Sequence, residues 1–518
     1  MSAGAVKHIV IVGGGSAGWL TAGVIAAEHQ SATETGLKVT LIESPDVRTV
    51  GVGEGTWPSM RETLHRMGVS ESEFIRECDA SFKQGSKFVN WVTNQPGDYY
   101  YHPFVLPAGY TETNLVVPWL ARHGNVPFAD LVSFQPHLCE RGCAPKQAST
   151  PEFAAVANYA YHLDAGKFGE FLKRHCVEKL GVRHVLDHVT GISSKENGDI
   201  AALNTQQGGN LAADLFIDCT GFAALLIGRH FEIPFVDCQP VLFNNRALAV
   251  QVPYPEEQAP IASQTNATAQ RGGWIWDIGL PTRRGVGHVY SSTHCSDDEA
   301  HAALKAYLQD TAPDVDTGDP RKISFSPGYR KTFWHRNCVA IGISAGFIEP
   351  LEASALALIE LSAAMLRDDM PATREVMDIV ADRFNRRFTY RWERIIDFLK
   401  LHYVLSRRED STFWTDHRDP DTVPDRLLEL LRLWRHQPPS RRDLPEAEEV
   451  FPSASYQYVL YGMGFRPEQR DTTRASDDYA SASRYFSDAA LNTRKMLAAL
   501  PSNRDLLNRV RTNGLPRV

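Results

Sequence analysis

The 518-residue sequence predicts an α/β protein, and three observations support this fold class. The chain opens with a short β-branched segment, a glycine-rich turn and an alanine-rich segment, which is the order of a buried parallel strand followed by a helix. Residues 211–222 and 337–346 repeat the pattern of an apolar strand that ends in a turn of small residues. Between these two segments, residues 251–281 and 285–292 indicate the strands of an antiparallel sheet.

The N-terminal segment predicts a complete βαβ unit. Residues 8–12 are an apolar strand, residues 19–29 a helix and residues 38–42 a second strand, which ends at Glu43. Glycines in the turn permit a tight bend, the approach of a pyrophosphate to backbone N–H groups and close packing of the helix. An acidic residue at the end of the second strand accepts hydrogen bonds from ribose hydroxyls. The predicted dinucleotide-binding residues are Gly13, Gly15, Ser16, Ala17, Gly18 and Glu43.

Two later turns extend this prediction to the kind of cofactor. Gly221 follows the strand within residues 211–222, and Gly342 and Ile343 lie in the turn within residues 337–346. Three nucleotide-type turns match a flavoprotein with two dinucleotide folds, a GR2-like architecture, in which the antiparallel sheet is an insert on the substrate side. A simple NAD dehydrogenase would not need the last two turns. The sequence therefore predicts FAD as the cofactor.

The C-terminal part of the chain has a different pattern. From Met370 to Tyr403, Arg, Trp, Phe and Leu recur at helical spacing; a proline-rich stretch at residues 437–445 interrupts the pattern, and a polar helical tail follows. We predict two domains. Residues 1–370 bind FAD and contain the inserted sheet, and residues 371–518 form a mostly helical region that closes the substrate side.

The composition excludes several other classes of protein. The 54 Lys and Arg residues are interspersed with 62 Asp and Glu residues, and the net charge of −8 predicts no nucleic-acid partner. Eight cysteines without a CxxC pair or a His/Cys cluster predict reduced thiols, a cytoplasmic location and no metal site. No apolar run is long enough to cross a membrane, since even residues 353–366 are interrupted by Glu360 and Ser362. We expect a monomer or a homodimer.

Several separated motifs agree with one another. They are GGGSAG at residues 13–18, GVGEGTWP at 51–58, SFKQG at 81–85, FVNW at 88–91, HPF at 102–104, WIWDI at 274–278, FIEPLE at 347–352 and the segment 406–414. With these motifs, the chain resembles the flavin-dependent halogenases of the tryptophan halogenase family over most of its length. The WxWxI stretch is the most specific of them, because it separates such halogenases from flavin hydroxylases.

The resemblance implies a reaction in two stages. A reduced flavin, FADH2, and O2 oxidise a bound chloride or bromide to hypohalous acid, which crosses the interior to an electron-rich aromatic substrate. A separate flavin reductase supplies the FADH2, because the chain has only one full dinucleotide fingerprint. The resemblance further implies that Gly53 and Glu54 bind the flavin. It also implies that Trp274 and Trp276 line the passage and keep the substrate away from the flavin.

Two catalytic side chains follow from the resemblance. Lys83 matches the essential lysine of the family, whose ammonium donates a hydrogen bond to hypohalous acid or whose amine is itself halogenated; the sequence leaves both open. Glu352 matches the family glutamate, whose carboxylate stabilises the developing cation on the ring and accepts its proton. Glu349 competes for that role, but Pro350 indicates that Glu349 precedes the helix, which favours Glu352.

The resemblance also implies a halide site and a ring pocket. The best-known members read Ser-Thr-Gly after the glutamate, where this chain reads ASA at residues 353–355. Backbone N–H groups hold the halide in those proteins, so we expect Ser354 and Ala355 to bind it at a helix N-terminus. The residues that match positions around an indole ring are His102, Pro103 and Phe104.

The native substrate is predicted less directly. Residues 439–464, which would hold the ammonium and carboxylate of an amino acid, lack a clear double-tyrosine and glutamate pattern. Tyr456, Tyr458 and Tyr461 have a spacing that suits a buried helix equally well. We therefore expect indole, or an indole-like or phenolic compound, ahead of free tryptophan. The halide preference, chloride or bromide, stays open.

A flavin-dependent aromatic hydroxylase, which is a monooxygenase, is the main alternative function. Flavin hydroxylases usually carry an aspartate in the last flavin turn, where this chain has GIS at residues 342–344, and this difference favours a halogenase. A flavin-binding protein without turnover is a second alternative. The presence of every expected catalytic side chain argues against it.

Overall fold

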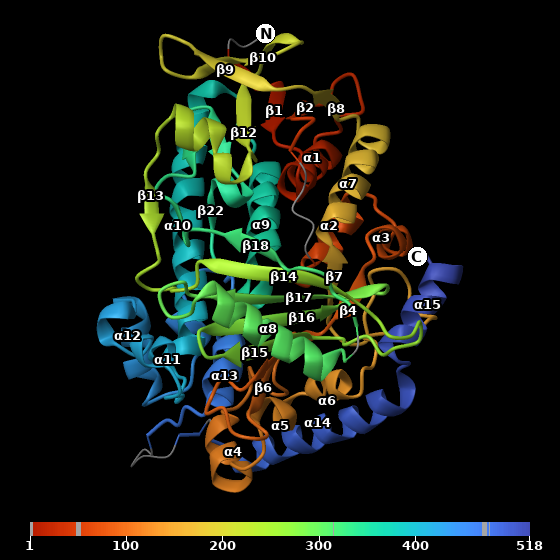
Figure 1. Ribbon diagram of the computed structural model, residues 1–518, viewed down its shortest axis with the longest axis vertical. Helices are drawn as coiled ribbons and strands as arrows, with labels where there is room; N and C mark the ends of the chain where they lie inside the picture. Colours follow the sequence, from red (N-terminus) through yellow and green to blue (C-terminus); the bar gives the residue numbers. More distant parts are fainter. Residues whose placement is uncertain (1–3, 48–52, 314, 469–473, 476, 518) are drawn as a thin grey trace. The chain divides into compact units, whose positions relative to one another are not determined.

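The computed structural model describes residues 4–47, 53–313, 315–468, 474–475 and 477–517 (Figure 1). The chain forms two compact units, each built from three separate stretches of sequence. Unit 1 contains Met1–Ala80, Leu163–Cys238 and Phe325–Trp392, and unit 2 contains Ser81–His162, Gln239–Ser324 and Glu393–Val518. The structure therefore divides the chain differently from the predicted boundary between residues 370 and 371, which falls inside unit 1. The roles predicted for residues 1–370 and 371–518 stay predictions.

Unit 1 is built on a six-stranded sheet whose central strands are parallel (Figure 1). In sheet order, its strands are β20 (Trp334–His335), β21 (Cys338–Ala340), β12 (Leu215–Asp218), β1 (His8–Val12), β2 (Lys38–Glu43) and β8 (Arg183–Leu186). β20 runs antiparallel to β21, and the other neighbours pair in parallel. The strands predicted before the three turns are β1, β12 and β21, so the α/β fold with a parallel sheet is confirmed.

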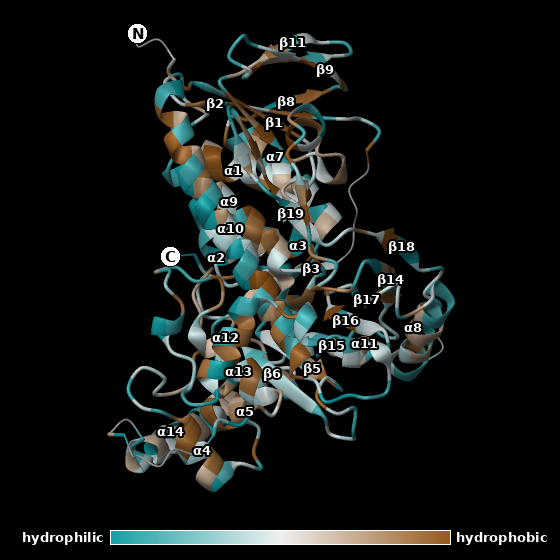
Figure 2. Cartoon of the chain, turned by 90° about the vertical axis from the view of Figure 1, so that its left-hand side faces the viewer, coloured by the Kyte–Doolittle hydropathy of each residue, from teal (hydrophilic) through white to brown (hydrophobic). Residues whose placement is uncertain are grey.

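The central strands of this sheet are apolar because helical crossovers cover a parallel sheet. Residues 9–12 of β1 are buried, and Figure 2 shows β1 and β2 in the brown of hydrophobic residues. α1 (Ser16–Glu28) connects β1 to β2 and contacts both α7 (Ala165–Lys179) and α9 (Ser354–Asp368). Two covering helices explain why α1 is apolar around most of its circumference, with buried residues from Gly18 to Ala26.

Two small antiparallel sheets and further helices complete unit 1. One sheet consists of β11 (Gly209–Ala212), β10 (Ile200–Thr205) and β9 (Val189–Ser194), and the other of β13 (Phe235–Asp237), β19 (Gly328–Arg330) and β22 (Gly346–Phe347). The strand β3 (Gly53–Gly55) and the helices α2 (Met60–Arg66) and α3 (Glu71–Glu77) also belong to this unit. α10 (Arg374–Val404), which the sequence predicts over residues 370–403, belongs to unit 1 as far as Trp392.

Unit 2 contains a seven-stranded, mostly antiparallel sheet. In sheet order, its strands are β18 (Arg321–Ser324), β14 (Arg246–Pro253), β17 (Arg283–Tyr290), β16 (Gly273–Gly279), β15 (Thr265–Gln270), β5 (Gly85–Val89) and β6 (Tyr99–Pro103). Only β15 and β5 pair in parallel within the described part of this sheet. On one face, Ile275 and Val286 pack against Leu304 of α8 (Asp297–Thr311). The antiparallel insert predicted from the sequence is thereby confirmed.

The rest of unit 2 is mostly helical. β4 (Ser81–Lys83) pairs antiparallel with residues 160–162 of β7 (Ala160–Asp164). The helices are α4 (Val116–His123), α5 (Phe128–Val132), α6 (Gln135–Glu140), α11 (Thr412–Asp416), α12 (Asp425–Trp434), α13 (Ser453–Gly462), α14 (Tyr479–Ala499) and α15 (Asn503–Asn513), with the last part of α10. The proline-rich stretch at residues 437–445 separates α12 from α13, as predicted. Among the residues that the structure describes, no helix combines the length and the apolar character needed to span a membrane.

Candidate active site

The first glycine turn of unit 1 has the shape that a phosphate-binding turn requires. Gly13 has a φ of +113°, which side-chain-bearing residues rarely adopt. A Cβ atom on Gly18 would lie 1.9 Å from the carbonyl oxygen of Gly13, so only glycine lets α1 pack this closely. No described atom lies within 4 Å of the position that a Cβ atom would take on Gly15. Ser16 and Ala17 then open α1, which points its N-terminus at this open side.

Glu43 lies directly against the same turn. A Cβ atom on Gly14 would lie 1.5 Å from Glu43 Oε2, so the carboxylate faces the backbone of the turn. Lys173 Nζ donates to Glu43 Oε1 at 2.9 Å and holds the carboxylate in place from α7. The expected ribose-binding residue therefore stands beside the expected pyrophosphate-binding turn.

The two later turns join the first one in unit 1. Gly342 has a φ of +76°, and a Cβ atom on it would lie 2.8 Å from the Cβ atom of Ala17. The turns that contain Gly221 and Gly342 contact each other, and Ser344 Oγ donates to the carbonyl oxygen of Asp218. Gly221, with a φ of +64°, has no described atom within 4 Å of its Cβ position. Ile343 of the same group is 37% exposed.

These turns fit a dinucleotide of the FAD type. Gly13 and Gly18 lie against other backbone atoms, whereas no described atom occupies the space beside Gly15 and Gly221. Such turns can receive a pyrophosphate against their backbone N–H groups. The Asp218 carboxylate shapes one wall, because it accepts the backbone N–H groups of Thr220, Leu226 and Ile227 at 2.8–3.0 Å. We conclude that the residues present suit the predicted cofactor.

The GVGEGTWP motif is described from Gly53 onward, and its residues 51 and 52 lie outside the described residues. Gly53 and Glu54 form part of β3. Burial raises the pKa of Glu54 to about 7. Trp57, near the end of the motif, donates from Nε1 to the carbonyl oxygen of Glu352 at 2.8 Å.

Glu352 has an unusual backbone. It lies in a single 3₁₀ turn, Leu351–Ala353, with φ 64° and ψ 11°, and Ala353 follows with φ 55° and ψ 43°. Left-handed backbone costs a residue with a Cβ atom roughly 1–2 kcal/mol, so two in succession need surrounding contacts to hold them. The Glu352 side chain is buried at 8% exposure, and Glu349 is buried as well. Both glutamates precede α9, which starts at Ser354.

The two residues expected to hold the halide open α9. The backbone N–H groups of the first helical turn have no partner inside the helix, and Ala353 supplies no side-chain cap. Ser354 and Ala355 therefore present backbone donors at the positive end of a 15-residue helix. This arrangement suits an anion.

Farther along α9, Glu360 is a buried carboxylate. Thr63 Oγ1 donates to Glu360 Oε1 at 2.6 Å, and Ser59 Oγ donates to Oε2 at 3.1 Å. Burial raises the pKa of Glu360 to about 7, although both hydroxyl groups favour the charged form.

Lys83 belongs to unit 2 and is almost completely buried, at 1% exposure. It ends β4, and its side chain lies on the same face of the strand as Ser81, whose direct partner on β7 is His162. His162 Nε2 lies 2.8 Å from Thr265 Oγ1. Burial, and then the Lys83 charge, hold the pKa of His162 well below its usual value, so this imidazole is neutral beside the ammonium. Lys83 Nζ lies 5.5 Å from the centroid of the Phe104 ring.

The HPF segment lies at the end of β6 in the same unit. His102 Nε2 lies 2.9 Å from Ser455 Oγ of α13, and Pro103 pairs with Gly85 of β5. Phe104 follows the strand, and its backbone N–H donates to Gln135 Oε1 at 2.7 Å. The structure therefore brings Phe104 next to Lys83.

Trp274 and Trp276 share one face of β16, since their positions differ by two. Trp276 stands between two small residues, Ala267 and Gly287, whereas Trp274 stands between Ala269 and Val289. Trp274 is buried, and its ring centroid lies 6.3 Å from that of Trp91 and 6.5 Å from that of Trp276. The small partners of Trp276 leave room for its indole.

Gly287→Ala tests this packing. A Cβ atom there would lie 2.1 Å from two ring atoms of Trp276, so the indole must move. We expect about tenfold slower product formation and about 1–3 kcal/mol lower stability, measured by turnover and urea unfolding. The exposed Gln251→Ala on the neighbouring strand is the control. Unchanged turnover and tryptophan fluorescence in the Gly287 variant would show that the Trp276 position is not critical.

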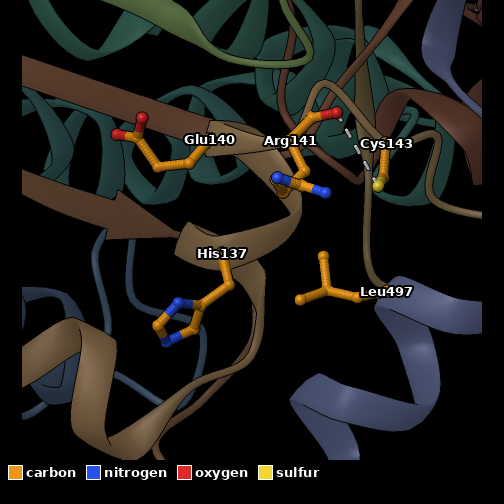
Figure 3. A pocket seen from close by; sticks show the side chains of 5 residues that line it. All are labelled: His137, Glu140, Arg141, Cys143 and Leu497. Atoms are coloured by element: carbon orange, nitrogen blue, oxygen red, sulfur yellow. Dashed lines mark hydrogen bonds between the residues drawn. The ribbon is translucent and has the colours of Figure 1, made fainter.

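Two open pockets of unit 2 have linings that, among the described residues, contain none of the predicted catalytic, halide-binding or ring-binding residues. Figure 3 shows a pocket of about 470 Å³ between α6 and α14, and it is lined by His137, Glu140, Arg141, Cys143 and Leu497. A second pocket, of about 300 Å³, is lined by Tyr110, Thr111, Thr113, Asn114, Leu115, Pro438, Pro439, Ser440, Arg441 and Gln457. Gln457 belongs to α13, which also carries Ser455, the partner of His102. Tyr456, Tyr458 and Tyr461 are buried in α13, as a buried helix predicts.

Comparison with known proteins decides the family. The family model described as "Tryptophan halogenase" matches residues 8–478. The chain belongs to the tryptophan halogenase family. It is therefore an enzyme, and its fold is that of the flavin-dependent halogenases.

Relatives of this tryptophan halogenase family member align over nearly its full length. The tryptophan 7-halogenase KtzQ of Kutzneria sp. (strain 744) is 35% identical over 494 residues, which cover 89% of this chain and 90% of that protein. The structure of a tryptophan halogenase from Shewanella frigidimarina NCIMB 400 is 49% identical, with a TM-score of 0.94 over 99% of both chains. BrvH, a flavin-dependent halogenase from Brevundimonas sp. BAL3, is 33% identical, with a TM-score of 0.86 over 98% of this chain and 99% of that one.

Three residues of this tryptophan halogenase family member gain importance only from the structure. His162 lies across the strands from the Lys83 region, Trp57 binds the backbone of Glu352, and Glu360 holds Ser59 and Thr63. For Glu360 the sequence carries a signal, an acidic residue inside an apolar helix. Nothing in the local sequence marks His162.

Proposed function

We propose that the chain is an FAD-dependent halogenase that uses FADH2, O2 and chloride or bromide to halogenate an electron-rich aromatic compound, indole or an indole-like molecule. The observation that carries the proposal is Lys83, a lysine with 1% exposure whose ammonium stands beside an aromatic ring and a neutral histidine. Such an enclosed donor suits the activation of a small neutral oxidant. The family membership and the cradle of glycines support the choice of flavin.

The proposed reaction has two steps, oxidation of the halide and halogenation of the ring. Reduced flavin, when held by the glycine turns, would supply the two electrons of the first step, in which FADH2, O2, a halide ion and a proton give FAD, water and hypohalous acid. The aromatic carbon then attacks the halogen, the oxygen–halogen bond breaks, and the carbon–halogen bond forms. The ring loses its proton, and the hydroxide released from hypohalous acid takes up a proton to become water.

Each proposed catalytic residue has one task in this scheme. The Lys83 ammonium donates a hydrogen bond to the oxygen of hypohalous acid, which stabilises the negative charge that develops there. The Glu352 carboxylate stabilises the cationic ring and accepts its proton. Ser354 and Ala355 offer backbone donors to the halide. Trp274 and Trp276 line the passage with apolar surface that excludes water.

The pocket beside α13 supports the proposed substrate class. The described lining of the 300 Å³ pocket contains no carboxylate that could pair with an ammonium group. Its one charged residue, Arg441, would repel an ammonium and attract a carboxylate, so this lining offers no partner for the ammonium of an amino acid. The missing partner for an ammonium supports indole ahead of free tryptophan, although several relatives are named as tryptophan halogenases. A separate flavin reductase supplies the FADH2.

Mass spectrometry tests the proposal. The protein is incubated with FAD, a flavin reductase, NADH, O2 and either bromide or chloride, together with indole, tryptophan and a set of phenols. We expect a halogenated product from indole, and at least about tenfold less from tryptophan. Hydroxylated indole formed without any halide would instead show a monooxygenase. O2 consumption without product from any aromatic compound would contradict both functions.

A further inference from the structure

Glu360 is a buried carboxylate that neither proposed chemical step uses. It lies on α9 eight residues after Glu352, and its exposure is 4%. A carboxylate in an apolar helix is unfavourable unless both oxygens find donors. Here each carboxylate oxygen accepts one hydrogen bond, Oε1 from the Thr63 hydroxyl at 2.6 Å and Oε2 from the Ser59 hydroxyl at 3.1 Å. Glu360 therefore connects α9 to Ser59, which precedes α2, and to Thr63 within α2.

A second hydrogen bond leads from α2 back to Glu352. The backbone N–H of Met60, the first residue of α2, donates to the carbonyl oxygen of Trp57 at 3.1 Å. The Trp57 indole in turn donates from Nε1 to the carbonyl oxygen of Glu352 at 2.8 Å. The contacts form a closed loop: Glu360 connects α9 to α2, α2 connects to Trp57, and Trp57 connects to Glu352, two residues before α9.

The last contact of this loop acts on a strained backbone. Glu352 and Ala353 are both left-handed, with φ of 64° and 55°. The ψ angle of Glu352 sets the direction of its carbonyl group, so a donor fixed at that oxygen also fixes the backbone from which the side chain projects. Without the donor, the residue is free to relax toward the right-handed region, and its carboxylate would move.

We propose that Glu360 is a positioning residue for Glu352: by holding Ser59 and Thr63, it keeps Trp57 on the Glu352 carbonyl and so fixes the Glu352 carboxylate. This inference rests on the proposed catalytic role of Glu352. Glu360 itself does not touch the substrate or the cofactor in this scheme. The chain offers a matched control, since Ser362 is a buried polar residue of the same helix whose Oγ donates within α9, to the carbonyl oxygen of Leu358 at 2.7 Å.

Steady-state turnover at saturating FADH2 is the first measurement. We expect Glu360→Ala to lower kcat by about 10- to 100-fold, with the substrate KM changed by less than about threefold, because a displaced carboxylate slows the chemistry rather than binding. Trp57→Phe, which removes a single hydrogen bond, is expected to lower kcat similarly. The double variant is expected to lose no more than the larger single variant, whereas independent effects would multiply. Ser362→Ala should behave like the unmodified protein.

Hydrogen exchange of the protein without cofactor is the second measurement. We expect Glu360→Ala to speed exchange of the amides at residues 57–63 and 351–355 by at least about threefold, while Ser362→Ala leaves them unchanged. Unchanged exchange at residues 351–355, or multiplying losses in the double variant, would overturn the positioning role. If Glu352→Gln keeps full turnover, the proposed role of Glu352 fails instead, and the exchange data still decide whether Glu360 fixes this backbone. If Glu360→Ala does not fold, the same turnover and hydrogen-exchange measurements are made on Trp57→Phe and Glu360→Gln.

Discussion

Lys83→Ala is expected to abolish halogenation, with a loss of at least about 10³-fold in product formed per FADH2 oxidised. The reason is that the ammonium is the buried donor beside Phe104, and alanine leaves hypohalous acid without activation. FAD binding should be retained, because the glycine turns that suit the cofactor belong to unit 1 and Lys83 belongs to unit 2. Mass spectrometry of the product and flavin fluorescence measure the two properties.

Two further variants make the Lys83 result decisive. Lys87→Ala removes a partly exposed lysine that pairs with Glu140, and it should keep turnover within about twofold, as surface ion pairs contribute little. Lys83→Met fills the same space without the charge and separates the loss of the ammonium from the loss of packing. Substantial halogenation by both Lys83 variants would exclude the proposed role.

Glu352→Gln is expected to lower kcat by about 10²- to 10⁴-fold, because the amide neither accepts the ring proton nor balances the cationic ring. The change keeps the size of the side chain, and the backbone contact with Trp57 uses the carbonyl oxygen of residue 352, which the substitution leaves in place. Single-turnover kinetics with reduced flavin, O2, bromide and indole, in which product formation is followed separately from flavin oxidation, measure the affected step.

Glu349→Gln is the matched comparison for this prediction. Glu349 is buried, three residues earlier, and precedes α9 as Glu352 does. We expect it to retain turnover within about tenfold, since the catalytic effect is assigned to the other carboxylate. A larger loss in the Glu349 variant than in the Glu352 variant would reverse the assignment of the two residues.

The parts of the fold that depend on short-range pattern follow from the sequence. Gly13 and Gly18 stand where a strand meets a helix, so their spacing alone predicts the turn, and the structure shows the close packing that excludes side chains there. The alternation of Trp274 and Trp276 likewise predicts a shared face of one strand. The paired partners, Ala267 and Gly287, become visible only once the register is known.

The parts that depend on contacts between distant residues could not be predicted. The left-handed backbone of Glu352 is held by Trp57, 295 residues earlier, and no local preference favours it. The partners of Glu360 are equally distant, in α2. The predicted boundary at residue 370 followed a change from mixed to helical pattern, whereas compact units follow contacts, and α10 makes contacts within unit 1 before it ends in unit 2.

The alternation of the chain between its two units has a consequence for its synthesis. Unit 1 receives its last stretch only when Trp392 has been made, and that stretch includes Asn385, whose side chain accepts the backbone N–H groups of Phe333 and Trp334. Unit 2 then waits for the C-terminal helices. Because unit 1 lacks part of its contacts until Trp392 has been made, its apolar strands, such as β1, stay uncovered longer than those of a unit built from one continuous stretch.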